Sequence, residues 1–387
     1  MKKQIHRLTG ILLFGCILAF AAVLYGNIAI PDTVQVLSED DHYLPALYTH
    51  DAENVRFLRS IAVKKNQVQT TKRIYAEPLG RAFGIKLYTD GVMVVRTDSV
   101  DTPQGSVSPA QKADVRAGDM ILSVDGNRMH TNREIANTVT QSAGKPMVLR
   151  VQRDNLIFET ELTPVQSALD GQYRAGIWVR DSSAGIGTLT FQVPQYGLFA
   201  GLGHAVCDID TGRLLPLSDG EAVDVTIKGS FKGHAGEPGE LCGVFQPGTI
   251  GALFGNTESG IYGAYKTEEP AKNLLPVAMY YEVKPGAATI LAEVDDSGVQ
   301  AYSVQITKLF SNPDAQQKNL VVKVTDRRLI EKTGGIVQGM SGSPILQNGM
   351  LVGAVTHVFV QDSLQGYGVY AQTMLQEMQR LASRAAS

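Results

Sequence analysis

Residues 333–345 read TGGIVQGMSGSPI, and this stretch displays Ser341 between glycines. Glycine adopts backbone angles that are closed to larger residues, so the chain can turn sharply here. Such a turn would bring the amide N–H groups of Gly339 and Ser341 towards one point, where they could hold the oxyanion of an acyl-transfer reaction. An isolated motif of this kind is more often a Gly/Ser/Pro-rich turn. A nucleophilic Ser341 therefore needs support from the rest of the chain.

A serine hydroxyl becomes a useful nucleophile only when a base takes its proton. Residues 200–206 read AGLGHAV and place His204 at the end of an apolar strand pattern over 196–202. We expect His204 to be the base, because a strand gives it a rigid mount. His357, on the strand after Ser341, is also a candidate. The other histidines precede the apolar N-terminal segment or lie in polar, turn-like surroundings: His6, His42, His50, His130 and His234.

Five segments in this order resemble the stage IV sporulation protein B (SpoIVB) peptidases, which are serine peptidases of endospore-forming bacteria with a chymotrypsin-like catalytic logic. They read GLGHA at 201–205, DIDTG at 208–212, TDR at 325–327, GGIVQGMSGSPI at 334–345 and GAVTHVF at 353–359. The resemblance implies that His204 is the general base, Ser341 the nucleophile and Asp326 the acid that orients the imidazole. We expect no cofactor and no bound metal.

The acid and the serine each have rivals nearby in the sequence. Asp326 lies only fifteen residues before Ser341, whereas most chymotrypsin-like enzymes carry the acid in the first barrel, so its role rests on the resemblance. Three other carboxylates stay open as alternatives, although the first two also suit the capping of a turn: Asp208, Asp210 and Asp224. Ser343 neighbours the nucleophile, but the Gly-x-Ser-Gly loop favours Ser341.

The N-terminus predicts a membrane segment. Residues 1–9 are basic, and residues 10–30 are uncharged and mostly apolar. At about 1.5 Å per residue, 21 helical residues span roughly 30 Å, enough to cross a bilayer. We expect a signal anchor or a long signal peptide, with the remainder outside the cytoplasm. Cys207 and Cys242, the two cysteines beyond this segment, fit two separate buried thiols better than one bridge.

Residues 31–76 are predicted to be a partly ordered spacer that self-cleavage can reach. The domain at 77–165 resembles a bacterial PDZ domain, because 108–126 read SPAQKADVRAGDMILSVDG and 131–134 have the spacing of a capping box. Such domains bind a peptide as an added strand. We expect this groove to use a strand that contains Phe83, Gly84, Ile85 and Lys86.

From 175 to 387 the chain is rich in short strands separated by Gly, Pro and Asp turns, which favours an antiparallel barrel or a pair of barrels. Taken with the resemblance to the SpoIVB peptidases, which implies a chymotrypsin-like double barrel, the predicted fold is mainly β, with a PDZ domain and a transmembrane or signal segment before the double barrel. A helix over 371–384 should dock on the barrel through one apolar stripe. His357 is expected in the wall of the substrate pocket, although it could equally cap its strand.

These observations predict a membrane-tethered or secreted serine endopeptidase that acts on protein or peptide substrates. A net charge of −3 gives no electrostatic reason to expect nucleic acid. The resemblance implies that the enzyme works between the forespore and mother-cell membranes, where it cuts itself and a membrane-bound regulator. That cut would release an intramembrane metalloprotease that processes a sigma factor. The alternative is a non-catalytic PDZ scaffold that binds this regulator.

Overall fold

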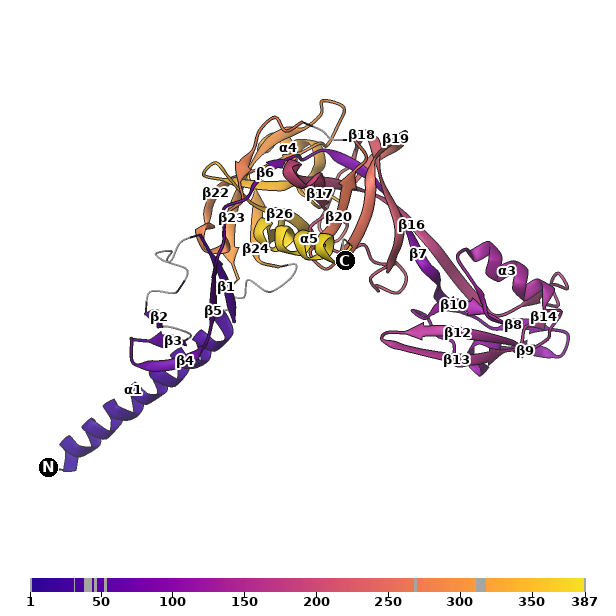
Figure 1. The fold of residues 1–387 in the computed structure, drawn as a ribbon, viewed down its shortest axis with the longest axis horizontal. Coiled ribbons are helices and arrows are strands. Elements are labelled where there is room, and N and C mark those ends of the chain that lie inside the picture. Colours follow the sequence, from indigo (N-terminus) through magenta and orange to yellow (C-terminus); the bar gives the residue numbers. More distant parts are fainter. Residues whose placement is uncertain are drawn as a thin grey trace.

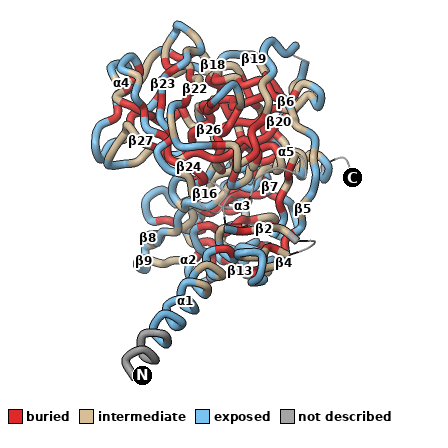
Figure 2. Tube along the Cα trace, turned by 90° about the vertical axis from the view of Figure 1, so that its left-hand side faces the viewer, coloured by how far each residue is buried: buried red, intermediate tan, exposed pale blue. Residues whose placement is uncertain are grey.

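The computed structural model describes residues 2–30, 32–37, 44, 47–51, 54–267, 270–310 and 318–385. It is built mainly of β-strands and has three parts, namely a pair of barrels, a smaller PDZ fold and an N-terminal helix that extends away from both (Figure 1). The expected fold class is confirmed. Figure 2 shows continuous buried segments inside the barrels and inside the PDZ fold, while the helix is exposed.

The second barrel carries the nucleophile loop. Its strands form a closed ring in the order β22-β23-β24-β27-β26-β25. Alternating residues such as Ile290, Val304 and Val322 fill its interior, as the period of two in a strand requires. The tight Asn348-Gly349 turn joins β25 to β26, with both residues at positive φ. The bounds are β22 (Gly286–Ala292), β23 (Gln300–Leu309), β24 (Leu320–Val324), α4 (Arg327–Thr333), β25 (Pro344–Gln347), β26 (Met350–Phe359) and β27 (Asp362–Tyr370).

The first barrel carries the histidine. Its strands neighbour one another in the order β7-β18-β19-β20-β17-β16, and pairing of β16 with β7 closes the ring. Phe83, Leu189 and Phe199 are fully buried in its core. The bounds are β7 (Ala82–Thr97), β16 (Ile177–Val193), η1 (Pro194–Tyr196), β17 (Leu198–Gly201), β18 (Leu217–Phe231), β19 (Glu240–Thr257) and β20 (Gly260–Tyr265).

The PDZ fold is inserted between β7 and β16. These two strands leave the barrel as one antiparallel ribbon, visible in Figure 1, and their far ends belong to the PDZ core. The expected capping box is confirmed, since Glu134 N donates to Thr131 Oγ1 at 3.2 Å and Thr131 N donates to Glu134 Oε2 at 3.2 Å. The bounds are β8 (Val100–Thr102), β9 (Gly105–Val107), α2 (Pro109–Lys112), β10 (Met120–Val124), β11 (Asn127–Arg128), α3 (Asn132–Gln141), β12 (Met147–Arg153), β13 (Leu156–Leu162), β14 (Val165–Gln166) and β15 (Tyr173–Arg174).

This insertion differs from the expected boundaries at 77–165 and 175–387. The first half of β7 lies before the PDZ fold in the sequence but pairs with β18 and β16 of the peptidase barrel. Phe83, Gly84, Ile85 and Lys86 therefore lie in the barrel and do not line the PDZ groove. A Cβ on Gly84 would meet Val223 at 2.7 Å and Phe245 at 2.9 Å, so barrel packing explains this glycine.

The N-terminal helix is the one described helix long and apolar enough to cross a membrane, over Thr9–Ala29. Its end packs on a small three-stranded sheet, where Tyr48 donates its hydroxyl to the carbonyl of Ala22 at 2.6 Å. The expected spacer thus holds strands, although 31, 38–43, 45–46 and 52–53 lie outside the described residues. The bounds are α1 (Lys2–Ala29), β1 (Thr33–Val36), β2 (Tyr48–Asp51), β3 (Asn54–Phe57), β4 (Ile61–Lys65), β5 (Gln67–Thr70) and β6 (Tyr75–Pro78).

The C-terminal helix α5 (Ala371–Ala385) docks on the barrels through the expected apolar stripe. Met374 and Met378 are fully buried in a cluster that also contains Phe191 and Tyr262 of the first barrel. Short elements β21 (Leu275–Pro276) and η2 (Tyr280–Glu282) connect the two barrels. Cys16, Cys207 and Cys242 are all free thiols, but Cys207 is exposed and Cys242 half-buried, so the expectation that both are buried is wrong.

Candidate active site

A cavity of about 460 Å³ lies between the two barrels. His204 enters it from the first barrel, while Ser341 and His357 enter it from the second. Its remaining wall is largely apolar and includes Ile186 and Val337. The structure therefore brings together the predicted base, the predicted nucleophile and the predicted pocket residue, which lie far apart in the sequence.

The loop that carries Ser341 is held through its backbone carbonyls. Gln338 O accepts from Leu241 N at 2.8 Å, and Met340 O accepts from Ser343 N at 3.0 Å and Ser343 Oγ at 2.7 Å. Ser343 is fully buried and bonded within the loop, so its hydroxyl is engaged in positioning. Among the neighbouring serines, only Ser341 lines the cavity.

Two amide donors in this loop are free. Within the described residues, neither the N–H of Gly339 nor the N–H of Ser341 has a hydrogen-bond acceptor. Gly339 has φ +94°, a conformation that favours glycine. Both residues line the cavity, which agrees with the predicted pair of oxyanion donors.

The Ser341 hydroxyl donates to the carbonyl oxygen of Thr356 at 2.6 Å. The loop as a whole is pressed against the first barrel, because a Cβ on Gly342 would lie 2.0 Å from Thr188 O and 2.6 Å from Leu202 N. Gly342 also has φ +99°. Only glycine at 342 lets the nucleophile loop approach the turn that precedes His204 this closely.

His204 follows a tight turn in which Leu202 has φ 65° and Gly203 has φ 70°. Its Nδ1 lies 2.8 Å from the carbonyl oxygen of Ala205. Because a carbonyl only accepts, Nδ1 carries the proton and Nε2 keeps its lone pair. Burial lowers the pKa of His204, partly opposed by this hydrogen bond. The imidazole is therefore neutral and able to accept a proton near pH 7.

His357 lies beside His204, with 4.5 Å between their ring centroids. Its side chain is exposed at the cavity mouth, yet the surrounding protein lowers its pKa, and the nearby His204 and Lys318 act in the same direction. Two adjacent cations would repel each other, so the pair is neutral near pH 7. The structure places His357 within reach of a substrate in the same cavity.

Asp326 is not brought to His204. Its side chain caps α4 by accepting from Arg328 N at 2.9 Å, pairs with the Arg328 guanidinium at 2.8 Å and accepts from Ser303 N at 3.2 Å. These bonds, the Arg328 side chain foremost, lower the pKa of Asp326 to about 2. A carboxylate beside His204 would raise the pKa of its imidazole, whereas that pKa is lowered. Asp326 therefore does not take the expected role of orienting the imidazole, because its carboxylate is bound to Arg328 at the start of α4.

The rival carboxylates do not line the cavity either. Asp208 is buried, contacts Arg180 and accepts from Thr211 N at 2.9 Å, so it caps the turn after His204 as the sequence allowed. Asp210 pairs with Arg180 at 2.8 Å. Asp224, on β18, lies against Gly248 of β19. Within the described residues, the group that meets Nδ1 of His204 is a backbone carbonyl.

A second groove of about 530 Å³ lies in the PDZ fold between α3 and the first residues of β16. Ile135 and Val139 of α3 face Ile177 and Val179 across it. This is where a peptide would add as a strand, because β16 pairs with β7 on one edge only in this region. This strand differs from the expected one at Phe83–Lys86, although Gly176-Ile177 at its start repeats the Gly-Ile pattern of residues 84–85.

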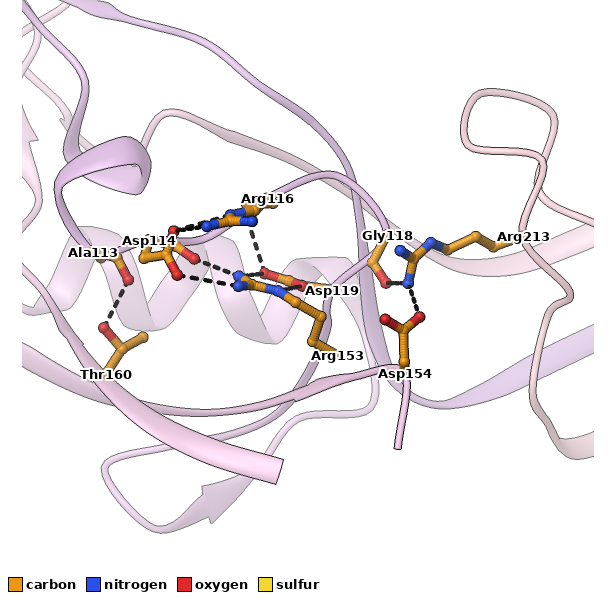
Figure 3. A network of polar contacts seen from close by, with 9 residues as sticks. All are labelled: Ala113, Asp114, Arg116, Gly118, Asp119, Arg153, Asp154, Thr160 and Arg213. Carbon is orange, nitrogen blue, oxygen red and sulfur yellow. Dashed lines mark hydrogen bonds and ion pairs between the residues drawn. The ribbon is translucent and has the colours of Figure 1, made fainter. Parts of the chain in front are cut away.

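The PDZ fold contacts the segment that follows His204. Arg213 donates to the carbonyl of Gly118 at 3.3 Å and to Asp154 Oδ1 at 2.9 Å (Figure 3). On the same face, Arg153 Nε donates to the buried Asp119 Oδ1 at 2.7 Å. Leu215 packs with Met93 and Met120 beneath this contact. The loop between His204 and β18 thus bridges the barrel and the PDZ fold.

Comparison with known proteins agrees with this architecture. The SpoIVB peptidase S55 family model matches residues 171–375, which is 205 of the 387 residues, and a PDZ domain model matches 105–153. A putative zinc metalloprotease of Clostridium perfringens is 31% identical over 70 residues, covering 18% of this chain and 21% of that protein. The zinc metalloprotease RasP of Geobacillus kaustophilus is 26% identical over 135 residues, covering 33% and 32%. The chain thus spans about a fifth to a third of the length of these relatives.

Two of the solved structures that match parts of this chain are proteases. The active form of a Mycobacterium tuberculosis protease has 13% identity and a TM-score of 0.30, with 51% of this chain and 74% of that chain covered. The HtrA-type protease AlgW with a decapeptide has 10% identity and a TM-score of 0.33, with 79% and 66% covered.

Proposed function

The chain belongs to the SpoIVB peptidase S55 family, and on this premise we propose that it is a serine endopeptidase with Ser341 as nucleophile and His204 as general base. The observation that carries the proposal is the single cavity between the barrels that holds both residues. Next to them, the amides of Gly339 and Ser341 have no acceptor among the described residues.

The proposed reaction begins when the Ser341 hydroxyl turns from the Thr356 carbonyl to Nε2 of His204. Oγ attacks the substrate carbonyl carbon while its proton passes to Nε2, and the carbonyl oxygen becomes an oxyanion held by the Gly339 and Ser341 amides. The imidazolium then gives its proton to the leaving amine as the C–N bond breaks. Water repeats the sequence on the acyl-enzyme. Each oxyanion donor contributes about 10²–10³-fold in kcat in comparable sites.

In this proposal the Ala205 carbonyl takes over part of the role that a carboxylate has in a triad. Its hydrogen bond at 2.8 Å fixes the tautomer of His204 and the plane of the ring. A neutral carbonyl stabilises the imidazolium less than a carboxylate would. We therefore expect that His204 is correctly oriented, and that no carboxylate within the described part of the chain stabilises its imidazolium form.

The proposed substrates are proteins or peptides. The cavity receives the side chain before the scissile bond, and His357 in its wall would favour a polar, hydrogen-bonding group such as that of glutamine. His357→Leu followed by peptide-library profiling tests this. A shift at this one subsite, with Ser341 still reactive, supports the pocket role. An unchanged profile leaves His357 a structural part of its strand.

We further propose that the enzyme acts in sporulation signalling, between the forespore and mother-cell membranes. Family membership and the apolar helix over Thr9–Ala29, either a membrane anchor or a signal sequence, support this placement. Its targets would be its own residues 31–76 and a membrane-bound regulator of an intramembrane metalloprotease that processes a sigma factor. N-terminal sequencing of the matured protein should find a first residue within 31–76. A start inside the barrels would contradict self-cleavage of the spacer.

A fluorophosphonate probe tests the chemistry directly. Labelling should occur on Ser341 and disappear in Ser341→Ala and in His204→Ala. Ser343→Ala, which loses the hydroxyl bond to Met340 O, should still be labelled on Ser341, at a reduced rate. A folded wild-type protein that stays unlabelled would favour the alternative function, a non-catalytic PDZ scaffold. That alternative draws on the groove between α3 and β16, which exists whether or not Ser341 reacts.

A further inference from the structure

Thr188 joins the two halves of the candidate site. It lies on β16 and is almost fully buried, with 1% of its surface exposed. Its backbone N–H donates to Ser341 O at 2.9 Å, and its hydroxyl donates to Gly339 O at 2.8 Å. Its carbonyl accepts from Leu202 N at 3.2 Å, two residues before His204. One residue of the first barrel thus holds both the nucleophile loop and the turn that carries the base.

The hydroxyl of Thr188 binds the peptide unit that lies between the two oxyanion donors. In a trans peptide unit the C=O and the next N–H point in opposite directions, and the described chain has no cis peptide bond. The carbonyls of Gln338 and Met340 accept hydrogen bonds from Leu241 N and from Ser343. The N–H groups on the opposite side of these two peptide units, those of Gly339 and Ser341, therefore point away from Leu241 and Ser343. The unit between these two donors is Gly339–Met340. Its carbonyl is the one that Thr188 Oγ1 holds.

We propose that Thr188 is a positioning residue for the oxyanion site. Its side chain fixes the peptide unit between the two donors, and its backbone sets the distance between the Ser341 loop and the His204 turn. The N–H of the same unit, on Met340, donates to Val337 O at 3.1 Å. Gly339 lacks a side chain and has φ +94°, so the bond from Thr188 is what fixes the carbonyl end of the unit. The inference rests on the proposed peptidase function, and it concerns a residue that touches no substrate.

The chain supplies a matched control two residues further along the same strand. Thr190 is also fully buried, but its hydroxyl has no hydrogen-bond partner among the described residues. Valine replaces the threonine hydroxyl by a methyl group of similar size. Thr188→Val therefore removes the bond to Gly339, while Thr190→Val makes the same chemical change without removing a bond.

The test compares kcat and KM on a fluorogenic peptide for the wild type, Thr188→Val, Thr188→Ser and Thr190→Val. A misaligned oxyanion site weakens the transition state more than the bound substrate, so Thr188→Val should lower kcat about 10–100-fold with KM changed less than threefold. Thr188→Ser keeps the hydroxyl and should recover most of kcat. Thr190→Val should match the wild type.

A peptidyl boronate provides a second readout, because its tetrahedral adduct occupies the oxyanion site. Its affinity should fall in parallel with kcat in Thr188→Val, while the affinity of the cleaved product stays unchanged. If Thr188→Val does not fold, Thr188→Ser and Thr188→Ala are compared instead, provided that their melting temperatures are similar. The serine variant should then have the higher kcat.

Equal kcat for hydroxyl-bearing and hydroxyl-free variants would overturn the positioning role, as would a loss in Thr190→Val equal to that in Thr188→Val. Failure of the proposed function looks different. In that case the wild type itself does not react at Ser341 with a fluorophosphonate.

Discussion

The hydroxyl of Ser341 donates to the main-chain carbonyl of Thr356 at 2.6 Å, one residue before His357 on β26. His204, on the opposite wall of the same cavity, has its Nδ1 bound to Ala205. The nucleophile therefore rests on its own barrel and must rotate towards the other to react. A net hydrogen bond of about 1 kcal/mol opposes that rotation, which substrate contacts can offset.

The first prediction concerns Asp326. Asp326→Asn should keep fluorophosphonate labelling within about threefold of the wild type, because asparagine also caps helices well and the described contacts of Asp326 do not reach His204. Asp326→Ala should lower the free energy of unfolding by about 1 kcal/mol through the lost cap of α4. The measurements are labelling rate and chemical denaturation. A loss of labelling of 10³-fold or more in folded Asp326→Asn would restore this residue as the orienting acid.

The second prediction concerns the pH dependence of catalysis. Burial lowers the pKa of His204 below its ordinary value near 6.5, and the base must be neutral. The neutral fraction rises with pH through the lowered pKa, so kcat/KM should be on its plateau at pH 7 and fall only below about pH 6.5. Initial rates at subsaturating peptide from pH 4 to 8 measure this. An acidic limb centred at or above pH 7 would instead indicate a carboxylate beside the imidazole.

The third prediction concerns acid stability. His357 has a folded-state pKa of about 4, below the unfolded value near 6.5, so the unfolded chain binds the proton first as pH falls. This contribution to stability is present above about pH 6.5 and is lost as the pH falls towards 4. Urea denaturation between pH 7 and 4 should show a shallower decline for His357→Gln than for the wild type. Parallel curves would mean that His357 is solvated enough to titrate normally.

The fourth prediction concerns the approach of the two barrels. A Cβ at Gly342 would overlap Thr188 O at 2.0 Å, where backbone atoms surround it, so Gly342→Ala should destabilise the fold by more than about 3 kcal/mol. Gly349→Ala is the control, because Gly349 also has positive φ but open space around it, and should cost about 1–2 kcal/mol. Thermal unfolding compares the two. Equal losses would mean that backbone strain, and not the clash, explains the glycine at 342.

The fifth prediction concerns the PDZ groove. Ala136 is exposed on α3 and lines the groove, so Ala136→Arg should block a peptide without disturbing the core. Asn137→Arg adds the same charge to the same helix outside the groove and should leave binding intact. Fluorescence anisotropy with a library of labelled peptides measures this, with at least a tenfold weaker affinity expected for Ala136→Arg. Equal affinities would place the peptide elsewhere.

The sequence alone determined the turns, the helix cap and the hairpin of this protein. The glycines around Ser341, the GLGHA turn, the capping box at Thr131 and the Asn348-Gly349 hairpin each depend on neighbouring residues and on backbone angles that those residues permit. The apolar N-terminal run and the alternating strands likewise follow from short-range patterns. Together with the resemblance to the SpoIVB peptidases, they predicted the double barrel, the PDZ fold and roles for His204 and Ser341.

Only the tertiary structure decided which distant residues meet. Phe83 and Gly84 carry a pattern that suits a PDZ groove, yet β7 runs through both folds and its first half is buried in the barrel. Asp326 lies near Ser341 in sequence, but the start of α4 fixes its carboxylate on Arg328. Thr188 has no motif at all. Its position follows from strand pairing across more than 150 residues, and long-range register is set by the packing of whole sheets, which no local pattern encodes.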